Sequence, residues 1–196
     1  KVKLFAAATK LHIINIDSDE KERFLQTKAD STVTYGMKGE GDVQGEMKEH
    51  DSTIQFQVGT TLINLPLKGA FNAYNALSAI TIAQSQGIAV DIAKKALGDM
   101  EMVPGRMEQV IKEPFSVVVD YAFTPVALEK VYQSLKPKTG KLICVISGTG
   151  GGRDKWKRPV LGKIAATYCD TIFVTDEDPY EEDPMEIIDQ VAEGTE

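Results

Sequence analysis

Arg106 and Asp120 are the two residues whose types and positions most clearly suggest chemistry. Arg106 directly follows a Pro104-Gly105 break, and Asp120 ends an apolar run at 116–119 that we expect to be a short buried strand. An acid at the carboxyl end of such a strand lies where open α/β sheets bind ligands, and it could accept hydrogen bonds from ribose hydroxyls. A guanidinium can stabilise phosphate charge through its planar fork of donors. The pair therefore fits a nucleotide site, or, as the structural alternative, an ion pair that joins a linker to a sheet.

Two asparagines one helical turn apart form a second candidate group. Asn72 and Asn75 lie in GAFNAYNAL, at the start of a predicted helix. Asparagine is less favourable than alanine inside a helix, so the pair needs an explanation. Either Asn72 caps the helix and Asn75 is solvated, or the two carboxamides bind an adenine edge or a ribose.

A glycine-rich run, GTGGGRDKWKRP at 148–159, lies between a predicted strand and a predicted helix. Backbone amides at a helix N-terminus can bind an anion, and Arg153 would add a charged partner. Arg153 takes the third-glycine position of G-x-G-x-x-G, and no Gly-Lys-Ser/Thr follows, so neither familiar nucleotide motif is present. The run predicts a carboxylate or phosphate site of another kind, with a mobile, solvated connector as the alternative.

An acidic segment, TDEDPYEEDP at 175–184, follows the next predicted strand. A negative rim opposite Arg153 could bind a zwitterion, with the acids facing its ammonium and the arginine its carboxylate. A solvated acidic loop is the alternative. His12 and His50 have no partners at ligand spacing, so we expect neither to be catalytic.

The residue pattern places these groups on an α/β frame of two parts. Before the Pro104-Gly105 break we expect strands at 9–17 and 32–35, an antiparallel meander at 43–67 with a turn at His50-Asp51, and helices at 20–29, 70–86 (closed by Gly87) and 91–100 (capped by Asp91). After it we expect strands at 116–120, 141–147 and 171–175 and helices at 125–135, 157–168 and 184–192. Repeated βα units predict a parallel sheet flanked by helices, so the domains should be 1–102 and 103–196.

The composition describes a globular chain with an acidic balance. The 196 residues are 42% hydrophobic and 26% charged, which excludes a fibre or a disordered chain. Lys and Arg number 22 against 29 Asp and Glu, and only the short run 153–158 is basic, so we expect no nucleic-acid partner. No apolar run reaches the roughly 20 residues that span a bilayer, and no signal peptide is recognisable. We therefore expect a cytoplasmic protein with no membrane partner. Separately, we expect a monomer.

The cysteines and the two ends carry further expectations. Cys144 and Cys169 are too few for a disulfide framework and indicate a reducing compartment. The chain begins with Lys1 rather than Met and ends at Glu196, directly after an amphipathic helix. We therefore expect it to be a fragment of a longer protein.

Six stretches of the sequence occur in the same order in the Mur ligases. They are KVKLF at 1–5, GAFNAYNAL at 69–77, VPGRMEQV at 103–110, VDYAFTPVAL at 119–128, GTGGGRDKWKRP at 148–159 and DEDPYEEDP at 176–184. Because the six matches are collinear, the chain resembles this family over nearly its whole length. The resemblance is greatest to the ligases that add the third residue of the peptidoglycan stem peptide.

The resemblance implies three domains, of which this chain would hold two in part. Residues 1–102 would be the later part of the central ATP-binding domain, a mixed sheet with the antiparallel meander and helices, and the domain's phosphate-binding loop would lie upstream. Residues 103–196 would be most of a Rossmann-like C-terminal domain that binds an amino acid. Two departures are Phe123 in place of the usual histidine and Thr-Gly-Gly-Gly at 149–152 in place of Cys-Gly-Gly-Asp.

The resemblance also implies roles for the nucleotide-site residues. It places Asn72 and Asn75 at adenine, and Arg106 and Asp120 at ribose and phosphates, with Arg106 as the catalytic residue. Lys1 matches a lysine that is carbamylated in the family and helps to hold Mg²⁺. A carbamate would supply the hard anionic oxygen that this ion prefers.

On the substrate side, the resemblance places Arg153 at the carboxylate of the incoming amino acid and Asp178 and Tyr180 at the same substrate. The family's Asp-Asn-Pro-Arg, which accompanies meso-diaminopimelate, is replaced by Glu-Asp-Pro-Tyr at 177–180. Without that arginine there is no obvious clamp for a second carboxylate. The sequence therefore favours lysine or another diamino acid that lacks it.

The implied activity is that of an ATP-dependent, ADP-forming ligase of peptidoglycan synthesis, with ATP and Mg²⁺ as cofactors. ATP would phosphorylate the D-glutamyl carboxylate of UDP-N-acetylmuramoyl-L-alanyl-D-glutamate, and the amine of a diamino acid would attack the acyl phosphate. Another Mur ligase or a folylpolyglutamate synthetase is the near alternative. A non-catalytic module that binds an anion or a nucleotide is the alternative of another class. Without the upstream loop, we expect this chain alone to be inactive.

Overall fold

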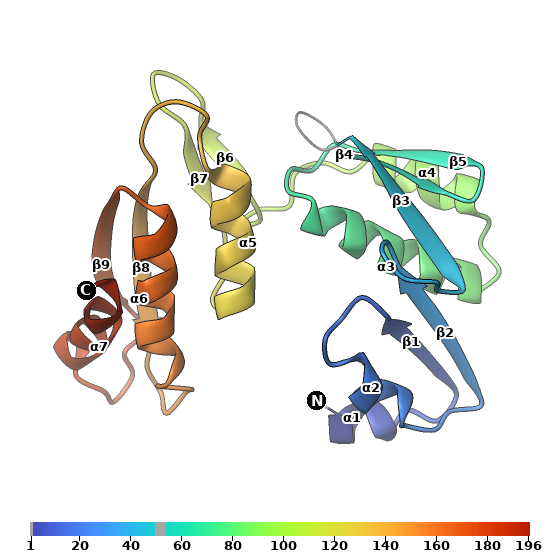
Figure 1. Ribbon diagram of the computed structural model, residues 1–196, viewed down its shortest axis with the longest axis horizontal. Coiled ribbons are helices and arrows are strands. Elements are labelled where there is room, and N and C mark those ends of the chain that lie inside the picture. Colours follow the sequence, from blue (N-terminus) through green and yellow to red (C-terminus); the bar gives the residue numbers. More distant parts are fainter. Residues whose placement is uncertain (1, 50–53) are drawn as a thin grey trace. The chain divides into compact units, whose positions relative to one another are not determined.

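The computed structural model describes residues 2–49 and 54–196, and the chain divides into two compact units, 1–104 and 105–196 (Figure 1). The junction follows Pro104, against an expected boundary after Met102. Lys1 and the predicted turn at His50-Asp51 lie outside the described residues.

The first unit is built on a mixed five-stranded sheet. Its elements are α1 (Val2–Ala6), β1 (Leu11–Asn15), α2 (Lys21–Leu25), β2 (Ser31–Gly36), β3 (Val43–Glu49), β4 (Ile54–Val58), β5 (Thr61–Leu65), α3 (Phe71–Ser85) and α4 (Val90–Gly98). The strand order is β1-β2-β3-β4-β5, with the first two pairings parallel and the last two antiparallel. The predicted mixed sheet with its antiparallel meander is therefore confirmed.

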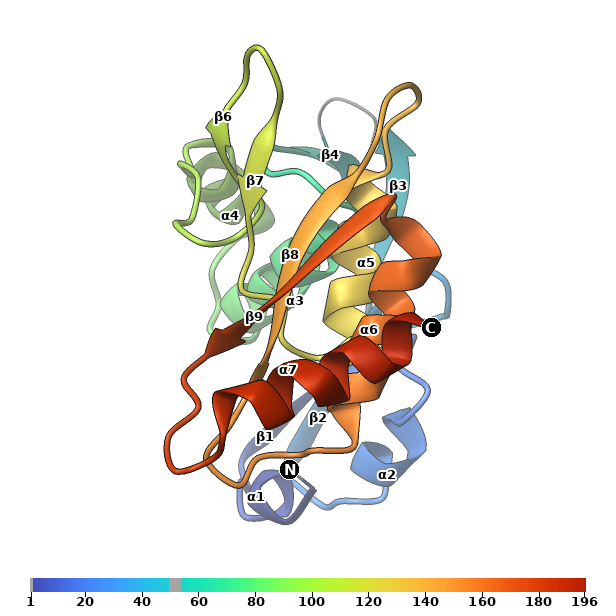
Figure 2. The same cartoon turned by 90° about the vertical axis from the view of Figure 1, so that its left-hand side faces the viewer.

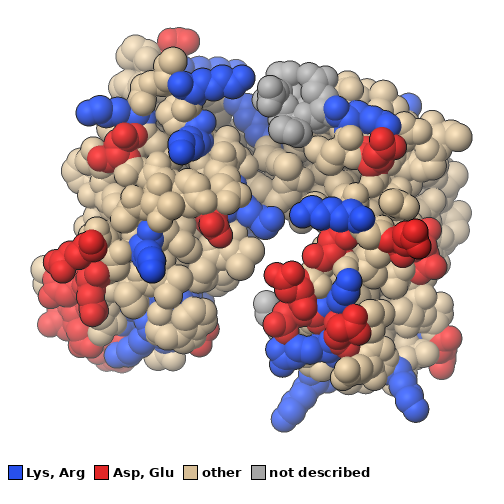
Figure 3. Space-filling view, in the orientation of Figure 1, with Lys and Arg blue, Asp and Glu red and all other residues tan. Residues whose placement is uncertain are grey.

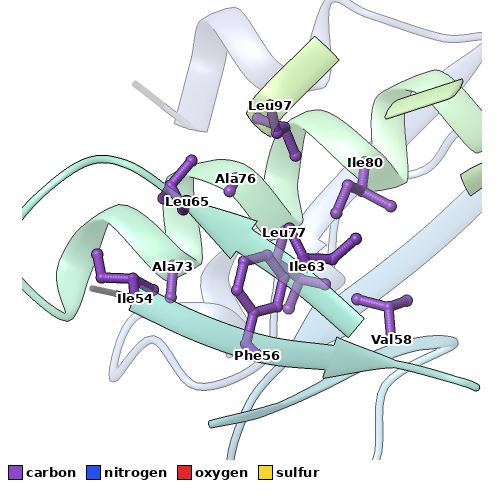
Figure 4. Close-up of a cluster of buried hydrophobic side chains, with 10 residues drawn as sticks. All are labelled: Ile54, Phe56, Val58, Ile63, Leu65, Ala73, Ala76, Leu77, Ile80 and Leu97. Carbon is purple, nitrogen blue, oxygen red and sulfur yellow. The ribbon is translucent and has the colours of Figure 1, made fainter. Parts of the chain in front are cut away.

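The core of this unit lies between the β4–β5 hairpin and α3. Alternate residues of β4 and β5 face inward, as the period of two requires. On the facing side of α3, Ala73 and Ala76 are small enough to let the helix approach the sheet closely, while Leu77 and Ile80 fill the space between (Figure 4). The buried cluster consists of Ile54, Phe56, Val58, Ile63, Leu65, Ala73, Ala76, Leu77, Ile80 and Leu97.

The ends of α2, α3 and α4 agree only in part with those predicted from the local sequence. α3 stops as expected, because Gly87 adopts φ +78° and its N–H bonds the Gln84 carbonyl while Ile88 N–H bonds that of Ala83. The prediction that Asp91 caps α4 is wrong: Ala89 is the N-cap, and Asp91 lies in the first turn. A carboxylate there still favours the helix dipole. The predicted helix 20–29 is also shorter, with only Lys21–Leu25 helical.

The second unit contains two separate pairs of strands and three helices longer than one turn. Its elements are β6 (Glu108–Ile111), β7 (Val117–Val119), α5 (Pro125–Leu135), β8 (Ile143–Thr149), α6 (Lys157–Tyr168), β9 (Thr171–Glu177), α7 (Pro184–Ala192) and the short 3-10 helix η1 (Glu193–Thr195). β8 and β9 are parallel and joined through α6, which is the predicted βα repeat. α7 contacts both strands, and α6 packs against α5 and α7 (Figure 2).

We predicted that the strand at 116–120 would be a buried strand of the parallel sheet, and this prediction is wrong for β7. It pairs antiparallel with β6, an element that the sequence did not predict, and Val119 is 46% exposed. The cause is local: the chain turns back after β6 and places β7 beside it, with a Gln109–Ser116 side-chain hydrogen bond of 2.8 Å across the pair. An apolar run of this length does not by itself distinguish a buried strand from one in a hairpin.

Candidate functional site

Asn72 and Asn75 are held together at the start of α3. The Asn75 amide nitrogen donates to the Asn72 side-chain oxygen at 2.9 Å, and the Asn72 amide donates to the Lys68 carbonyl at 2.7 Å. The N-cap residue is Ala70, and it makes no side-chain capping bond. The interpretation of Asn72 as the cap is therefore wrong, because its side chain instead reaches back along the chain and orients Asn75.

Arg106 and Asp120 lie on neighbouring segments at the open end of the β6–β7 pair, just before β6 and just after β7, but form no ion pair with each other within the described residues. Asp120 Oδ2 accepts the N–H of Met107 at 2.8 Å, and Met107 has φ +50°. The Arg106 guanidinium carbon instead lies 5.1 Å from the centroid of the Tyr121 ring, and its Nη1 donates to Gly105 O at 3.3 Å. The ion-pair alternative is therefore wrong. Asp120 holds a left-handed turn in place, and Arg106 stays exposed on an aromatic face.

The glycine-rich loop packs against the acidic loop that follows β9. Gly150 N–H donates to the Asp178 carbonyl at 3.1 Å, and a β-carbon at Gly150 would overlap the Pro179 carbonyl oxygen. Gly152 N–H donates to the Glu182 carboxylate at 3.0 Å. The expectation that these amides bind an external anion is therefore wrong for Gly150 and Gly152, because the chain supplies their acceptors.

Arg158 is the centre of this arrangement and was not identified from the sequence. It is fully buried, and its guanidinium donates to both oxygens of Glu182, at 3.1 and 3.2 Å, to Gln190 at 2.7 Å and to the Thr149 carbonyl at 2.9 Å. Lys155 adds a 2.9 Å ion pair to the same carboxylate. With these partners, of which Arg158 contributes most, the pKa of Glu182 is lowered to about 2.

These burials also change the interpretation of the basic run 153–158. Arg158 is fully buried, so it does not contribute to a surface basic patch, and only 6% of Lys157 is exposed. The only signal in the sequence was the position of Arg158 in the first turn of a predicted helix next to a glycine-rich loop. Nothing in the sequence pointed to Glu182 as its partner.

The three predicted substrate residues lie on the glycine-rich loop after β8 and the acidic loop after β9, which are hydrogen-bonded to each other. Arg153 is exposed, and no hydrogen bond or ion pair of its side chain occurs in residues 2–49 and 54–196. Asp178 and Tyr180 have positive φ of 42° and 54°. The Tyr180 ring covers Gly151, where a β-carbon would lie 2.8 Å from it. Over α7, which the acidic loop precedes, acidic side chains gather on the surface (Figure 3).

Asp17 makes a second polar cluster, in the first unit, whose partners the sequence did not reveal. Its carboxylate accepts the N–H groups of Met37, Lys38 and Gly39 at 2.6 to 2.9 Å and the hydroxyl of Tyr74 at 3.0 Å. Burial alone would raise the pKa of Asp17, but these four donors outweigh it and hold the pKa below its usual value. Burial, followed by the hydrogen bond to Asp17 and the charge of that carboxylate, raises the pKa of Tyr74 to about 12.

The remaining candidate groups have structural partners. His12 is buried, with its Nε2 2.6 Å from the Ala8 carbonyl and its Nδ1 3.2 Å from the Thr27 hydroxyl. Cys144 and Cys169 are free thiols, and burial, followed by the neighbouring Cys144 thiol, raises the pKa of Cys169 to about 12. His50 lies outside the described residues. In the part of the chain that the structure describes, no helix is long and apolar enough to cross a membrane.

Comparison with known proteins agrees with this architecture. The Mur ligase middle domain matches residues 1–83, and the glutamate ligase domain of Mur ligases matches residues 105–196. The chain belongs to the Mur ligase family. Within the second unit, the match begins at the first residue after the junction.

Two relatives and one solved structure illustrate the similarity. The UDP-N-acetylmuramyl-tripeptide synthetase of Roseiflexus sp. is 37% identical over 95% of this chain and 38% of its own length. The UDP-N-acetylmuramoyl-L-alanyl-D-glutamate–2,6-diaminopimelate ligase of Syntrophomonas wolfei is 39% identical over 93% of this chain and 38% of its own length. A crystal structure of MurF from Acinetobacter baumannii, 21% identical, has the same fold over 94% of this chain and 40% of its own, with a TM-score of 0.74. The chain thus spans less than two fifths of these curated relatives.

Proposed function

We propose that the protein to which this chain belongs is an ATP-dependent, ADP-forming ligase that joins a diamino acid to UDP-N-acetylmuramoyl-L-alanyl-D-glutamate in peptidoglycan synthesis. The observation that carries the proposal is the succession of a Mur ligase middle domain and a glutamate ligase domain in one chain, with relatives of 37% and 39% identity named for this step. We propose that it acts in the cytoplasm as a monomer. The two parts would be an ATP-binding portion, 1–102, and an amino-acid-binding portion, 103–196.

For the nucleotide, the proposal assigns adenine to Asn72 and Asn75, and ribose and phosphates to Arg106 and Asp120. The Asn72–Asn75 hydrogen bond fixes one carboxamide against the other, which reduces the entropy lost on binding. Asp120 uses one oxygen for Met107, and its other oxygen has no donor among the described residues. Arg106 keeps an exposed guanidinium, which suits a residue that stabilises charge during phosphoryl transfer.

The reaction then follows as acyl activation. The D-glutamyl carboxylate oxygen attacks the γ-phosphorus of ATP, ADP leaves, and an acyl phosphate forms. The free amine of the amino acid attacks the acyl carbon, the C–O bond to phosphate breaks, and an amide, inorganic phosphate and a proton result. The protein's part is to position the reactants and stabilise charge, with Arg106 as the proposed catalytic residue.

Mg²⁺ enters the proposal only through Lys1. The described residues contain no group of three or more His, Cys, Asp or Glu side chains that could hold a metal ion. Lys1, the predicted carbamylated ligand, lies outside them. No step is therefore assigned to the ion.

For the amino acid, we propose Arg153 as the partner of the carboxylate and the segment with Asp178 and Tyr180 as the side-chain subsite. Support comes from the charges: the neighbouring cations Lys155 and Arg158 are both engaged by Glu182. A second substrate carboxylate would therefore find no uncommitted cation in this pair. Together with Tyr180 in place of the arginine of Asp-Asn-Pro-Arg, this leads us to propose lysine, or a diamino acid with one carboxylate, rather than meso-diaminopimelate.

Phosphate release by the full-length protein tests the proposal. We expect release from ATP only when both the UDP-muramoyl dipeptide and an amino acid are present, and the loss of most of it in Arg106→Ala. Equal release with and without the dipeptide would exclude this ligase. A substrate panel that includes folates and other UDP-muramoyl peptides separates it from folylpolyglutamate synthetase and the other Mur ligases, whereas a non-catalytic binding module would give no ATP-dependent product at all.

A further inference from the structure

Lys157, the first residue of α6, is a buried cation without an acidic partner in the described part of the chain. Only 6% of its surface is exposed. The one identified contact of its side chain among the described residues is with the ring of Phe123, whose centroid lies 5.2 Å from the Lys157 Nζ. Lysine is rarely buried to this extent, and a largely buried charge is normally paired. The Lys157 Nζ is not among the fully buried polar atoms that lack a partner, so the ammonium has no anion beside it within the described residues but still reaches the surface.

The neighbouring cations show the contrast. Arg158, the next residue, is also buried but binds both oxygens of Glu182. Lys155 binds the same carboxylate at 2.9 Å. The nearby acid is therefore committed to other cations. A cation–π contact replaces only part of the hydration that a buried ammonium loses.

Lys157 ends a row of cations and rings that begins at Arg106. The Arg106 guanidinium lies 5.1 Å from the Tyr121 centroid, the Tyr121 and Phe123 centroids are 5.4 Å apart, and Lys157 lies over Phe123. Tyr121 is 58% exposed and Phe123 44% exposed. Two positive charges thus border one exposed aromatic surface, and both belong to the second unit.

We propose that Lys157 binds a phosphoryl group on the same surface as Arg106. The proposal rests on the proposed function, because the nucleotide or the acyl phosphate of that reaction would bring the phosphoryl group. A lysine ammonium is a compact point charge that serves as a phosphate ligand. Its position in the first turn of the 12-residue helix α6 adds the favourable end of the helix dipole. The ring of Phe123 holds the ammonium in place without neutralising it.

Binding of pyrophosphate, ADP and adenosine to this 196-residue chain, measured by calorimetry, tests the proposal. In Lys157→Met, which keeps an unbranched apolar stem over Phe123, we expect pyrophosphate and ADP affinity to fall at least about tenfold. Lys163→Met, which removes an exposed charge from the same helix, should change it by less than about twofold. Adenosine affinity should be the same in all variants. Lys157→Gln repeats the test should the methionine variant not fold, with thermal unfolding as the control.

The outcomes separate this proposal from the proposed function. Equal pyrophosphate affinity in Lys157→Met and Lys163→Met overturns it, and so does a wild-type chain that binds no pyrophosphate. A loss in Arg106→Ala with none in Lys157→Met overturns it as well but leaves the ligase proposal intact. If the full-length protein fails the phosphate-release test while pyrophosphate binding still requires Lys157, the ligase proposal fails and the phosphoryl site stands.

Discussion

The carboxylate of Glu182 accepts two hydrogen bonds from the fully buried guanidinium of Arg158, 24 positions earlier in the chain. The same carboxylate accepts the N–H of Gly152, so one residue of the acidic loop fixes the glycine-rich loop as well. A buried guanidinium left without its partner would be strongly unfavourable. The pair therefore holds in place the two loops on which Arg153 and Tyr180 lie.

Glu182→Gln should flatten the dependence of stability on pH. The pKa of Glu182 is about 2 in the folded chain against an ordinary value of 4.5, so the folded state binds this proton less tightly than the unfolded state. The stability that Glu182 contributes is complete above about pH 4.5 and is lost as the pH falls toward 2. Urea unfolding at several pH values should show this loss in the wild type and not in the variant. Glu181→Gln, at the exposed neighbouring carboxylate, is the matched control; parallel curves for wild type and Glu182→Gln would refute the assignment.

Gly150→Ala should destabilise the second unit, because the added methyl group would overlap the Pro179 carbonyl oxygen. Overpacking against backbone cannot be relieved by a side-chain rotation, so we expect a cost of about 1–3 kcal/mol or more. Gly98→Ala is the control, since its β-carbon would meet nothing closer than 3.9 Å and alanine is the better helix former. Chemical denaturation measures both, and equal stability of the two variants would show that the loops can separate without cost.

The sequence was sufficient to predict the bounds of helices whose ends are marked by characteristic residues. The bounds of α5, α6 and α7 agree with prediction, helped by prolines at the start of α5 and α7 that fit only the first turn of a helix. β6 was missed because its four residues, EQVI, show no alternation, and its pairing changed the environment of β7. The pairing of β6 with β7 depends on the turn that joins the two strands. The pattern of apolar residues does not encode that turn.

The candidate site was predictable in its residues more than in its contacts. Arg153, Asp178 and Tyr180 do lie on loops that contact each other, because both loops follow neighbouring parallel strands. Arg158 was missed because an arginine in a basic run looks solvent-exposed until its acid is known. Asp17 was missed for a different reason: three of its four donors are backbone N–H groups, which every residue but proline has.

Asp17→Asn should destabilise the first unit by about 1–3 kcal/mol, because an amide has only one oxygen to accept the donors that two carboxylate oxygens now share. Tyr74→Phe removes one of these bonds and should cost less, about 0.5–1.5 kcal/mol. Since the pKa of Asp17 is lowered on folding, its contribution should also fade as the pH drops below the ordinary aspartate range. Denaturation of both variants at pH 7 and pH 3 measures the loss of unfolding free energy in each. A larger loss in Tyr74→Phe than in Asp17→Asn would contradict the prediction.

Tyr180→Arg should shift amino-acid selection toward meso-diaminopimelate in the full-length protein, for which we propose ligase activity. The wild-type ring lies over Gly151 and offers no charge, whereas a guanidinium at this position could bind a second carboxylate in a bidentate manner. We expect the ratio of kcat/KM for meso-diaminopimelate to that for lysine to rise about tenfold or more, with Tyr180→Phe as a control that leaves the ratio unchanged. Steady-state phosphate release with each amino acid measures it. A wild-type protein that already prefers meso-diaminopimelate would show that a cation other than one at position 180 binds the second carboxylate, and would contradict the prediction.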